Sequence, residues 1–107
     1  MESEKERAAE EVLNAKATFE MALSNKRKYP LLEFRVFARA TRSYIGLTAG
    51  DPLVHRKIAG EISGLADYLR LERKRVPGDV LFEADRLQCL LFSGYDPSFE
   101  GDEPPGF

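Results

Sequence analysis

The sequence is short of the residues that most often carry chemistry. Among its 107 residues it has no tryptophan, a single cysteine (Cys89) and a single histidine (His55). One thiol cannot form a disulfide within the chain, and a zinc site normally needs several cysteine or histidine ligands. We also find no convergent set of carboxylates. We therefore expect no metal site, no cofactor and no catalytic residues, and we predict that the chain is not an enzyme.

Long apolar runs are also missing. No stretch approaches the roughly 20 apolar residues that a membrane-spanning helix needs, and residues 1–7 are charged rather than apolar, unlike a secretory signal. We therefore expect a cytoplasmic protein with no membrane partner. The hydrophobic fraction of 43% is ordinary for a globular protein. A chain of this length fits one domain with a modest core.

The formal net charge of −2 conceals an uneven distribution along the chain. Residues 1–24 carry three basic and six acidic side chains (−3), residues 25–76 carry twelve and five (+7), and residues 77–107 carry one and seven (−6). A basic middle between acidic ends can bind an anionic partner, or the ends can neutralise it within the fold. The sequence leaves both alternatives open.

Apolar spacing and turn residues together predict four helices. We place them at residues 3–25, 31–48, 52–75 and 80–93. Ser3 and Glu6 have the spacing of a capping box, and we expect Asp51 and Asp79 to cap the third and fourth helices. Gly50 suits the left-handed conformation that ends a helix. The short connections predict an all-α fold, a four-helix bundle with antiparallel up-and-down topology.

The second predicted helix is apolar on two sides. One face holds Phe34, Phe37, Ala38, Thr41, Tyr44 and Ile45, and the other holds Leu32, Val36, Ala40 and Leu47. A helix of this kind is normally the central one of a bundle, so we place it at the centre. A strand at residues 32–36 is the alternative, because these residues alternate. The helix is preferred because the alternation fails at Phe37.

Two glycines lie inside the third predicted helix, away from its apolar stripe. Gly60 and Gly64 each cost about 1 kcal/mol relative to alanine in a helix interior. Close approach of another backbone would justify them, and two tolerated surface glycines would explain them equally well.

The last residues of the chain differ in composition from the rest. Residues 95–107 contain three prolines, two glycines and four acidic residues, so they cannot form a regular helix. We divide the chain into a bundle domain (residues 1–94) and an extended acidic tail (residues 95–107). The tail carries three aromatic side chains whose free exposure is unfavourable, so we expect it to fold back over the bundle or to dock on a partner.

The basic middle contains two candidate sites for an anion or a nucleic acid. They are Arg35, Arg39 and Arg42 along one stripe of the second helix, and Arg73, Lys74 and Arg75 at the end of the third. Arginines on one ridge can bind phosphate or carboxylate bidentately. If the helices alternate in direction, the second cluster shares a pole of the bundle with residues 26–28. The alternative is ordinary: charge rows are usually solvated or paired with nearby acids, and cations favour helix C-termini.

Several apolar side chains have no place in the predicted bundle interior. They are Phe82, Cys89 and Phe92 on the outer side of the fourth helix, and Tyr95, Phe99 and Phe107 in the tail. Such a surplus in a small chain typically marks an interface. We therefore predict a protein partner, with a homodimer as the first expectation.

The segment Phe37-Ala38-Arg39-Ala40-Thr41-Arg42-Ser43 resembles a helix found in some bacterial HEPN-type domains, which are small helical bundles. The resemblance covers only the second predicted helix. It implies an all-α fold and, in active members, RNA cleavage by an arginine and a histidine four to six residues apart. That spacing is absent, because the nearest arginine before His55 is Arg42. The resemblance therefore supports the fold and argues against catalysis.

These observations predict a non-catalytic helical protein-interaction domain that binds another protein or a copy of itself. The alternative is a nucleic-acid-binding or HEPN-like domain that acts through the basic central segment. The two differ in their response to salt, because phosphate contacts weaken steeply as the salt concentration rises.

Overall fold

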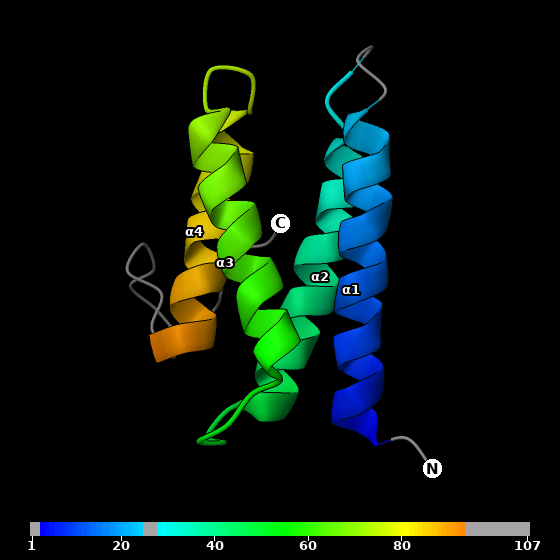
Figure 1. Cartoon of the computed structure of the whole chain (residues 1–107), viewed down its shortest axis with the longest axis vertical. Coiled ribbons are helices and arrows are strands. Elements are labelled where there is room, and N and C mark those ends of the chain that lie inside the picture. Colours follow the sequence, from blue (N-terminus) through cyan, green and yellow to red (C-terminus); the bar gives the residue numbers. More distant parts are fainter. Residues whose placement is uncertain (1–2, 25–27, 94–107) are drawn as a thin grey trace.

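The computed structural model describes residues 3–24 and 28–93. Within these ranges the chain forms four helices and no strand: α1 (Glu4–Leu23), α2 (Leu31–Thr48), α3 (Arg56–Leu71) and α4 (Gly78–Ser93). The helices alternate in direction (Figure 1), which confirms the predicted all-α four-helix bundle. None of these four helices is long and apolar enough to cross a membrane.

Two helical hairpins make up the bundle. α1 packs along α2 and α3 packs along α4, while smaller α2–α4 and α1–α3 contacts join the hairpins. Figure 1 shows that α1 and α3 diverge toward the end at which both helices finish. We call this end the open pole; its described residues are 28–30 and 72–77. The opposite end, where residues 49–55 join α2 to α3, is the closed pole.

The core contains the apolar stripes that the sequence predicts. They are Ala8, Val12, Ala15 and Phe19 of α1, Ile58, Ile62, Leu65 and Leu69 of α3, and Val80, Ala84 and Leu87 of α4. Three buried phenylalanines contact one another in turn: Phe19 and Phe34 meet edge to face with ring centroids 5.3 Å apart, and Phe34 and Phe37 are tilted with centroids 6.0 Å apart. Each such aromatic pair contributes about 0.5–1.5 kcal/mol beyond its buried area.

Several helix ends follow local sequence signals. The Ser3 hydroxyl accepts a hydrogen bond from the backbone N–H of Glu6 at 3.1 Å, which confirms the cap of α1. α2 begins at Leu31 and ends at Thr48, as predicted. Gly50 has a φ of 83°, the left-handed conformation that glycine adopts without a steric penalty.

α3 begins four residues later than predicted, at Arg56. Asp51 does not cap it, because its carboxylate forms an ion pair with Lys5 of α1. His55 has an extended backbone (φ −63°, ψ 124°), and its N–H is donated to the hydroxyl of Tyr44. Residues 51–55 are therefore used to cross from the end of α2 to the start of α3, and a tertiary hydrogen bond fixes where the helix begins.

The connection between α3 and α4 also corrects the predicted bounds. α3 ends at Leu71, and residues 72–76 form tight turns in which the N–H of Arg75 is donated to the carbonyl of Glu72 at 2.8 Å. α4 begins at Gly78, so Asp79 lies in its first turn instead of capping it. The chain has to reverse before Pro77, and turns with i to i+3 bonds achieve this over fewer residues than an α-helix.

Most of the second apolar face of α2 is exposed and only Ala40 is half-buried, so the prediction of a central α2 is wrong. The exposed fractions are 70% for Leu32, 51% for Val36 and 40% for Leu47. In this bundle α2 has two helical neighbours, α1 and α4, and both cover its first face. The glycines of α3 are surface glycines, because a Cβ atom added at Gly60 or Gly64 would meet nothing within 4 Å.

Candidate interaction surfaces

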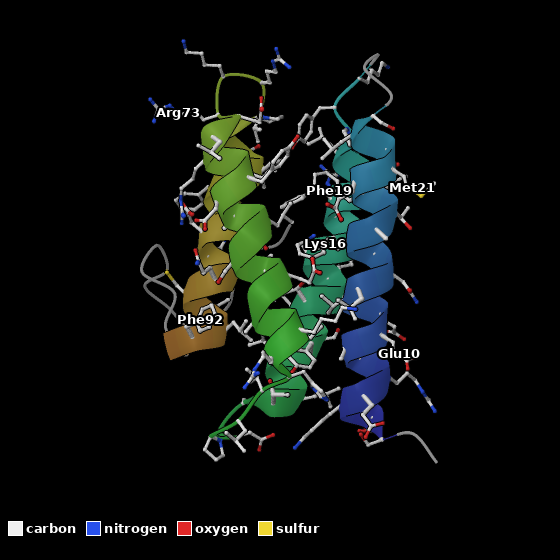
Figure 2. All side chains as sticks on the ribbon, in the orientation of Figure 1. Glu10, Lys16, Phe19, Met21, Arg73 and Phe92 are labelled. Atoms are coloured by element: carbon white, nitrogen blue, oxygen red, sulfur yellow. The ribbon has the colours of Figure 1, made fainter. Side chains whose placement is uncertain are left out.

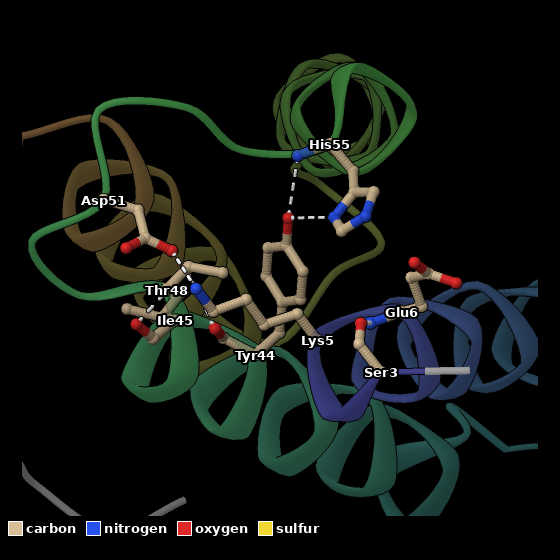
Figure 3. Close-up of polar contacts among 8 residues, drawn as sticks. All are labelled: Ser3, Lys5, Glu6, Tyr44, Ile45, Thr48, Asp51 and His55. Atoms are coloured by element: carbon tan, nitrogen blue, oxygen red, sulfur yellow. Dashed lines mark hydrogen bonds and ion pairs between the residues drawn. The ribbon is translucent and has the colours of Figure 1, made fainter. Parts of the chain in front are cut away.

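At the closed pole, a buried tyrosine of α2 contacts the residue that precedes α3. Tyr44 is fully buried, and its hydroxyl accepts the N–H of His55 at 2.8 Å while lying 2.8 Å from Nδ1 of the same residue (Figure 3). Both contacts are satisfied when the hydroxyl donates its proton to Nδ1. The described residues give the exposed imidazole no second side-chain hydrogen bond that would position it for acid–base chemistry. We interpret this pair as a structural contact.

The predicted arginine stripe is divided between the interior and the surface. Arg42 donates from Nε and Nη2 to the two carboxylate oxygens of Glu83, both at 2.9 Å. Glu83 is fully buried, and Nη1 of Arg86 lies 3.1 Å from its Oε1. Arg35 and Arg39 are exposed. The stripe is therefore not a continuous anion-binding ridge, since Arg42 already holds a carboxylate of α4.

Glu83 is an interior residue that we did not predict from the sequence. The signal was present, because Val80, Ala84 and Leu87 set the inward face of α4 and residue 83 falls on it. A carboxylate on an inward face needs a cationic partner, since burying an isolated charge is costly. Asp85 points elsewhere and pairs with Arg70 of α3 at 2.6 Å. The two acids thus face different helices, as their spacing predicts.

Basic side chains gather at the open pole. Arg73, Lys74, Arg75 and Lys28 are all exposed there, and Figure 2 shows Arg73 projecting beyond α3. This confirms that the end of α3 shares a pole with Lys28; residues 26 and 27 lie outside the described part of the chain. None of the four exposed cations forms an ion pair with an acid of residues 3–24 or 28–93.

A groove of about 760 Å³ lies between α1 and α3 at the open pole. It is lined by Lys16, Glu20, Leu23, Ser24, Lys28, Tyr29, Pro30, Gly64, Leu65, Tyr68, Leu69, Glu72, Arg75 and Val76. Lys16 lies between α1 and α3 (Figure 2). It links the two walls, because its ammonium lies 2.5 Å from Glu61 of α3 and 3.1 Å from Glu20 of α1. Burial lowers the pKa of Lys16, but the hydrogen bonds and charges of these carboxylates outweigh it and raise that pKa above its ordinary value. Lys16 therefore stays charged.

The outer face of the first hairpin is a second candidate surface. We call the second apolar face of α2 the α2 strip: Leu32, Val36 and Leu47, which are exposed, and Ala40, which is half-buried. Beside this strip, α1 and α2 form a shallower hollow of about 480 Å³, lined by Glu11, Asn14, Ala15, Thr18, Val36, Arg39, Ala40 and Ser43. Its lining is dominated by small or uncharged side chains. Such a surface can accommodate another helix with little desolvation of charge.

The predicted interface residues of α4 form a smaller apolar patch. Phe82 and Phe92 are 54% and 56% exposed, and Cys89 is half-buried. The Arg86 guanidinium lies 5.7 Å from the ring centre of Phe82, within the range of a cation–π contact. Tyr95, Phe99 and Phe107 lie outside the described residues.

These features define a small helical bundle with an exposed apolar face and a basic open pole. Within residues 3–24 and 28–93, no group of three or more histidine, cysteine, aspartate or glutamate side chains is arranged to hold a metal ion. No family model, curated protein or solved structure matches the chain. The resemblance of residues 37–43 to a HEPN-type helix therefore stays a prediction.

Proposed function

We propose that the chain is a non-catalytic protein-interaction domain that associates with a second copy of itself through the outer face of α2. The observation that carries the proposal is the exposure of the α2 strip. Leu32 alone is 70% exposed, and Val36 is 51% exposed. Exposed apolar side chains that share one face of a helix typically mark an interface, since covering them removes apolar area from water.

The order of residues in the α2 strip suits pairing with itself. Leu32 and Leu47 stand at its two ends, about 22 Å apart along the helix axis, and Ala40 lies near the middle. In an antiparallel pair, Leu32 of one copy would lie against Leu47 of the other. The small alanines would then meet at the centre, where the helices approach most closely. A twofold interface needs this kind of self-complementary patch.

Charge around the hollow is compatible with such pairing. Glu11 of α1 and Arg39 of α2 both line it. A face with one acid and one cation does not repel its own copy as a face of one sign would. Burying the strip also leaves the fold of each protomer unchanged, because Leu32, Val36 and Leu47 are exposed in the single chain.

Sedimentation equilibrium over a range of protein concentrations tests the proposal. We expect a concentration-dependent dimer, and we expect Val36→Glu and Leu47→Glu each to shift the mass to that of a monomer. The helical circular dichroism should be unchanged, and the melting temperature should no longer depend on protein concentration. Leu53→Glu is the matched control, because Leu53 is 82% exposed and lies outside the strip. A monomer of constant mass at micromolar concentrations, or equal effects of the three substitutions, would overturn the proposal.

Nucleic-acid binding is a second candidate, supported by the gathering of Lys28, Arg73, Lys74 and Arg75 at one pole. If this pole binds duplex nucleic acid, the logarithm of affinity should fall linearly with the logarithm of salt concentration. Replacing Arg73, Lys74 and Arg75 by glutamine should flatten the slope by about 0.9 per lost phosphate contact. A second variant with Arg35→Gln and Arg39→Gln tests the exposed arginines of α2 in the same way. An unchanged slope in both variants would leave these cations as surface charges.

A further inference from the structure

We infer that the groove at the open pole binds a small amphipathic anion, an alkyl or aryl chain that ends in a carboxylate or phosphate group. The inference does not depend on self-association, because the groove is built from α1, α3 and the pole, whereas the α2 strip contributes none of its lining residues.

The shape of the groove suits a ligand of this size. Its volume of about 760 Å³ lies within the range of small-molecule sites. Leu65 and Leu69 of α3 are buried side chains that line its floor, and Leu23 of α1 and Val76 add apolar surface. An apolar chain laid along these side chains would remove both its own surface and theirs from water.

One wall offers an unused hydrogen-bond donor. The hydroxyl oxygen of Tyr29 is inaccessible to solvent and has no hydrogen-bond partner among the described residues. Burial, with a smaller contribution from Tyr68, raises the pKa of Tyr29 to about 12, so the hydroxyl keeps its proton at neutral pH. Edge contact with Phe19, at a centroid distance of 6.1 Å, holds the ring in place. A ligand oxygen reaches this hydroxyl when the side chains that cover it move aside, and it then gives the hydroxyl the partner it lacks.

The charges of the lining favour an anion. Lys28 and Arg75 are exposed and form no ion pair with a described residue. Of the two acids in the lining, Glu20 is held by Lys16. Glu72 is the other, and it opposes an anion. The balance is one positive charge, and Arg73 and Lys74 add to it at the pole. A carboxylate or phosphate directed at Lys28 and Arg75 would gain charge-assisted hydrogen bonds.

Isothermal titration of the full chain with dodecanoate tests the inference, with dodecyl phosphate, dodecanol and dodecyltrimethylammonium as ligands of the same chain length. We expect both anions to bind and the cation not to bind. We expect the affinity for dodecanol to be at least on the order of tenfold lower than the affinity for dodecanoate. Whichever anion binds more tightly identifies the preferred headgroup. Each ligand is used below its micellar concentration.

Substitutions locate the site. Lys28→Gln and Arg75→Gln should each weaken dodecanoate severalfold, Glu72→Gln should strengthen it, and Tyr29→Phe should weaken it while the fold keeps its stability. Lys57→Gln is the control, because Lys57 is an exposed cation in the first turn of α3 at the closed pole. Dodecanol binding as tightly as dodecanoate, or equal effects of Lys28→Gln and Lys57→Gln, would overturn the inference. The inference would also be overturned if Val36→Glu abolished dodecanoate binding and Lys28→Gln left it unchanged.

Discussion

Glu83 is a fully buried carboxylate that faces guanidinium groups from two directions. Arg42 reaches it from α2 through two hydrogen bonds, and Arg86 reaches it from one turn later in α4. Taking such charges out of water is costly, and the bidentate geometry offsets part of that cost. This cluster ties the two hairpins together, since α2 belongs to the first and α4 to the second.

Replacing Glu83 by glutamine should destabilise the fold strongly. The substitution removes the negative charge but leaves Arg42 and Arg86 in place, so we expect the free energy of unfolding to fall by about 3 kcal/mol. Urea denaturation followed by circular dichroism measures this change. Asp85→Asn is the control: its ion pair with Arg70 is about half exposed, and exposed pairs contribute less than about 1 kcal/mol. Equal effects of the two substitutions would show that the Glu83 cluster has no special role.

Replacing Tyr29 by phenylalanine should leave the unliganded protein as stable as before, or raise its free energy of unfolding by up to about 1 kcal/mol, because a buried hydroxyl without a partner is removed.

The same substitution should change how the free energy of unfolding depends on pH in the alkaline range. The pKa of Tyr29 is raised from about 10 to about 12, so the folded state holds this proton more tightly than the unfolded state. Its titration leaves stability unchanged below pH 10 and lowers it as the pH rises from 10 toward 12. Stability of the natural chain should fall over this window, and less so in Tyr29→Phe. In an ultraviolet titration of tyrosinate, Tyr29→Phe should lack the phase that occurs at the highest pH. A titration curve identical to that of the natural chain would contradict the raised pKa of Tyr29.

At the scale of single helices, α3 keeps a glycine in its interior that nothing in the structure requires. Gly60 is exposed, and an added Cβ atom would meet nothing within 4 Å. Gly60→Ala should therefore raise the free energy of unfolding by about 0.5–1 kcal/mol through helix propensity alone. Gly50→Ala is the opposite case, because its φ of 83° strains any other residue, and it should lower stability by about 1 kcal/mol. Thermal denaturation of both variants checks the pair. If both substitutions changed the melting temperature in the same direction, this account of the two glycines would be refuted.

At the scale of the whole molecule, the fold neutralises part of the charge asymmetry along the chain. Arg42 and Arg70 of the basic middle pair with Glu83 and Asp85 of the acidic last segment. Lys5 and Lys16 of the first segment pair with acids of the middle. The cations at the open pole take no part in these pairs, so the positive field is concentrated there.

Removing residues 95–107 tests our expectation for the tail, which lies outside the described residues. Its four acids and three aromatic side chains suit a segment that covers basic and apolar surface, and burying one ring contributes on the order of 1.5–3 kcal/mol. We expect the shortened chain to unfold at lower urea concentration and to bind RNA more tightly. Loss of a complex, with stability unchanged, would instead indicate that the tail docks on a partner. A shortened chain that matches the full chain in all three measurements would refute both alternatives.

The sequence by itself determined the four helices and the buried stripes of α1, α3 and α4. These features depend on contacts within a few residues: the spacing of Val12, Ala15 and Phe19, the cap at Ser3, and the left-handed glycine at position 50. Local interactions are the same before and after the helices meet. Spacing therefore predicted α2 at its observed bounds and the inward face of α4.

The tertiary structure decided which faces meet and which stay exposed. The helical pattern gave α2 two apolar faces, but only the arrangement of α1 and α4 determined which one is covered. Glu83 and Arg42 are 41 residues apart, and no local rule pairs them. Tyr44 likewise fixes the start of α3 from the preceding helix. The groove exists because α1 and α3 diverge, and that angle is set by the packing of all four helices at once.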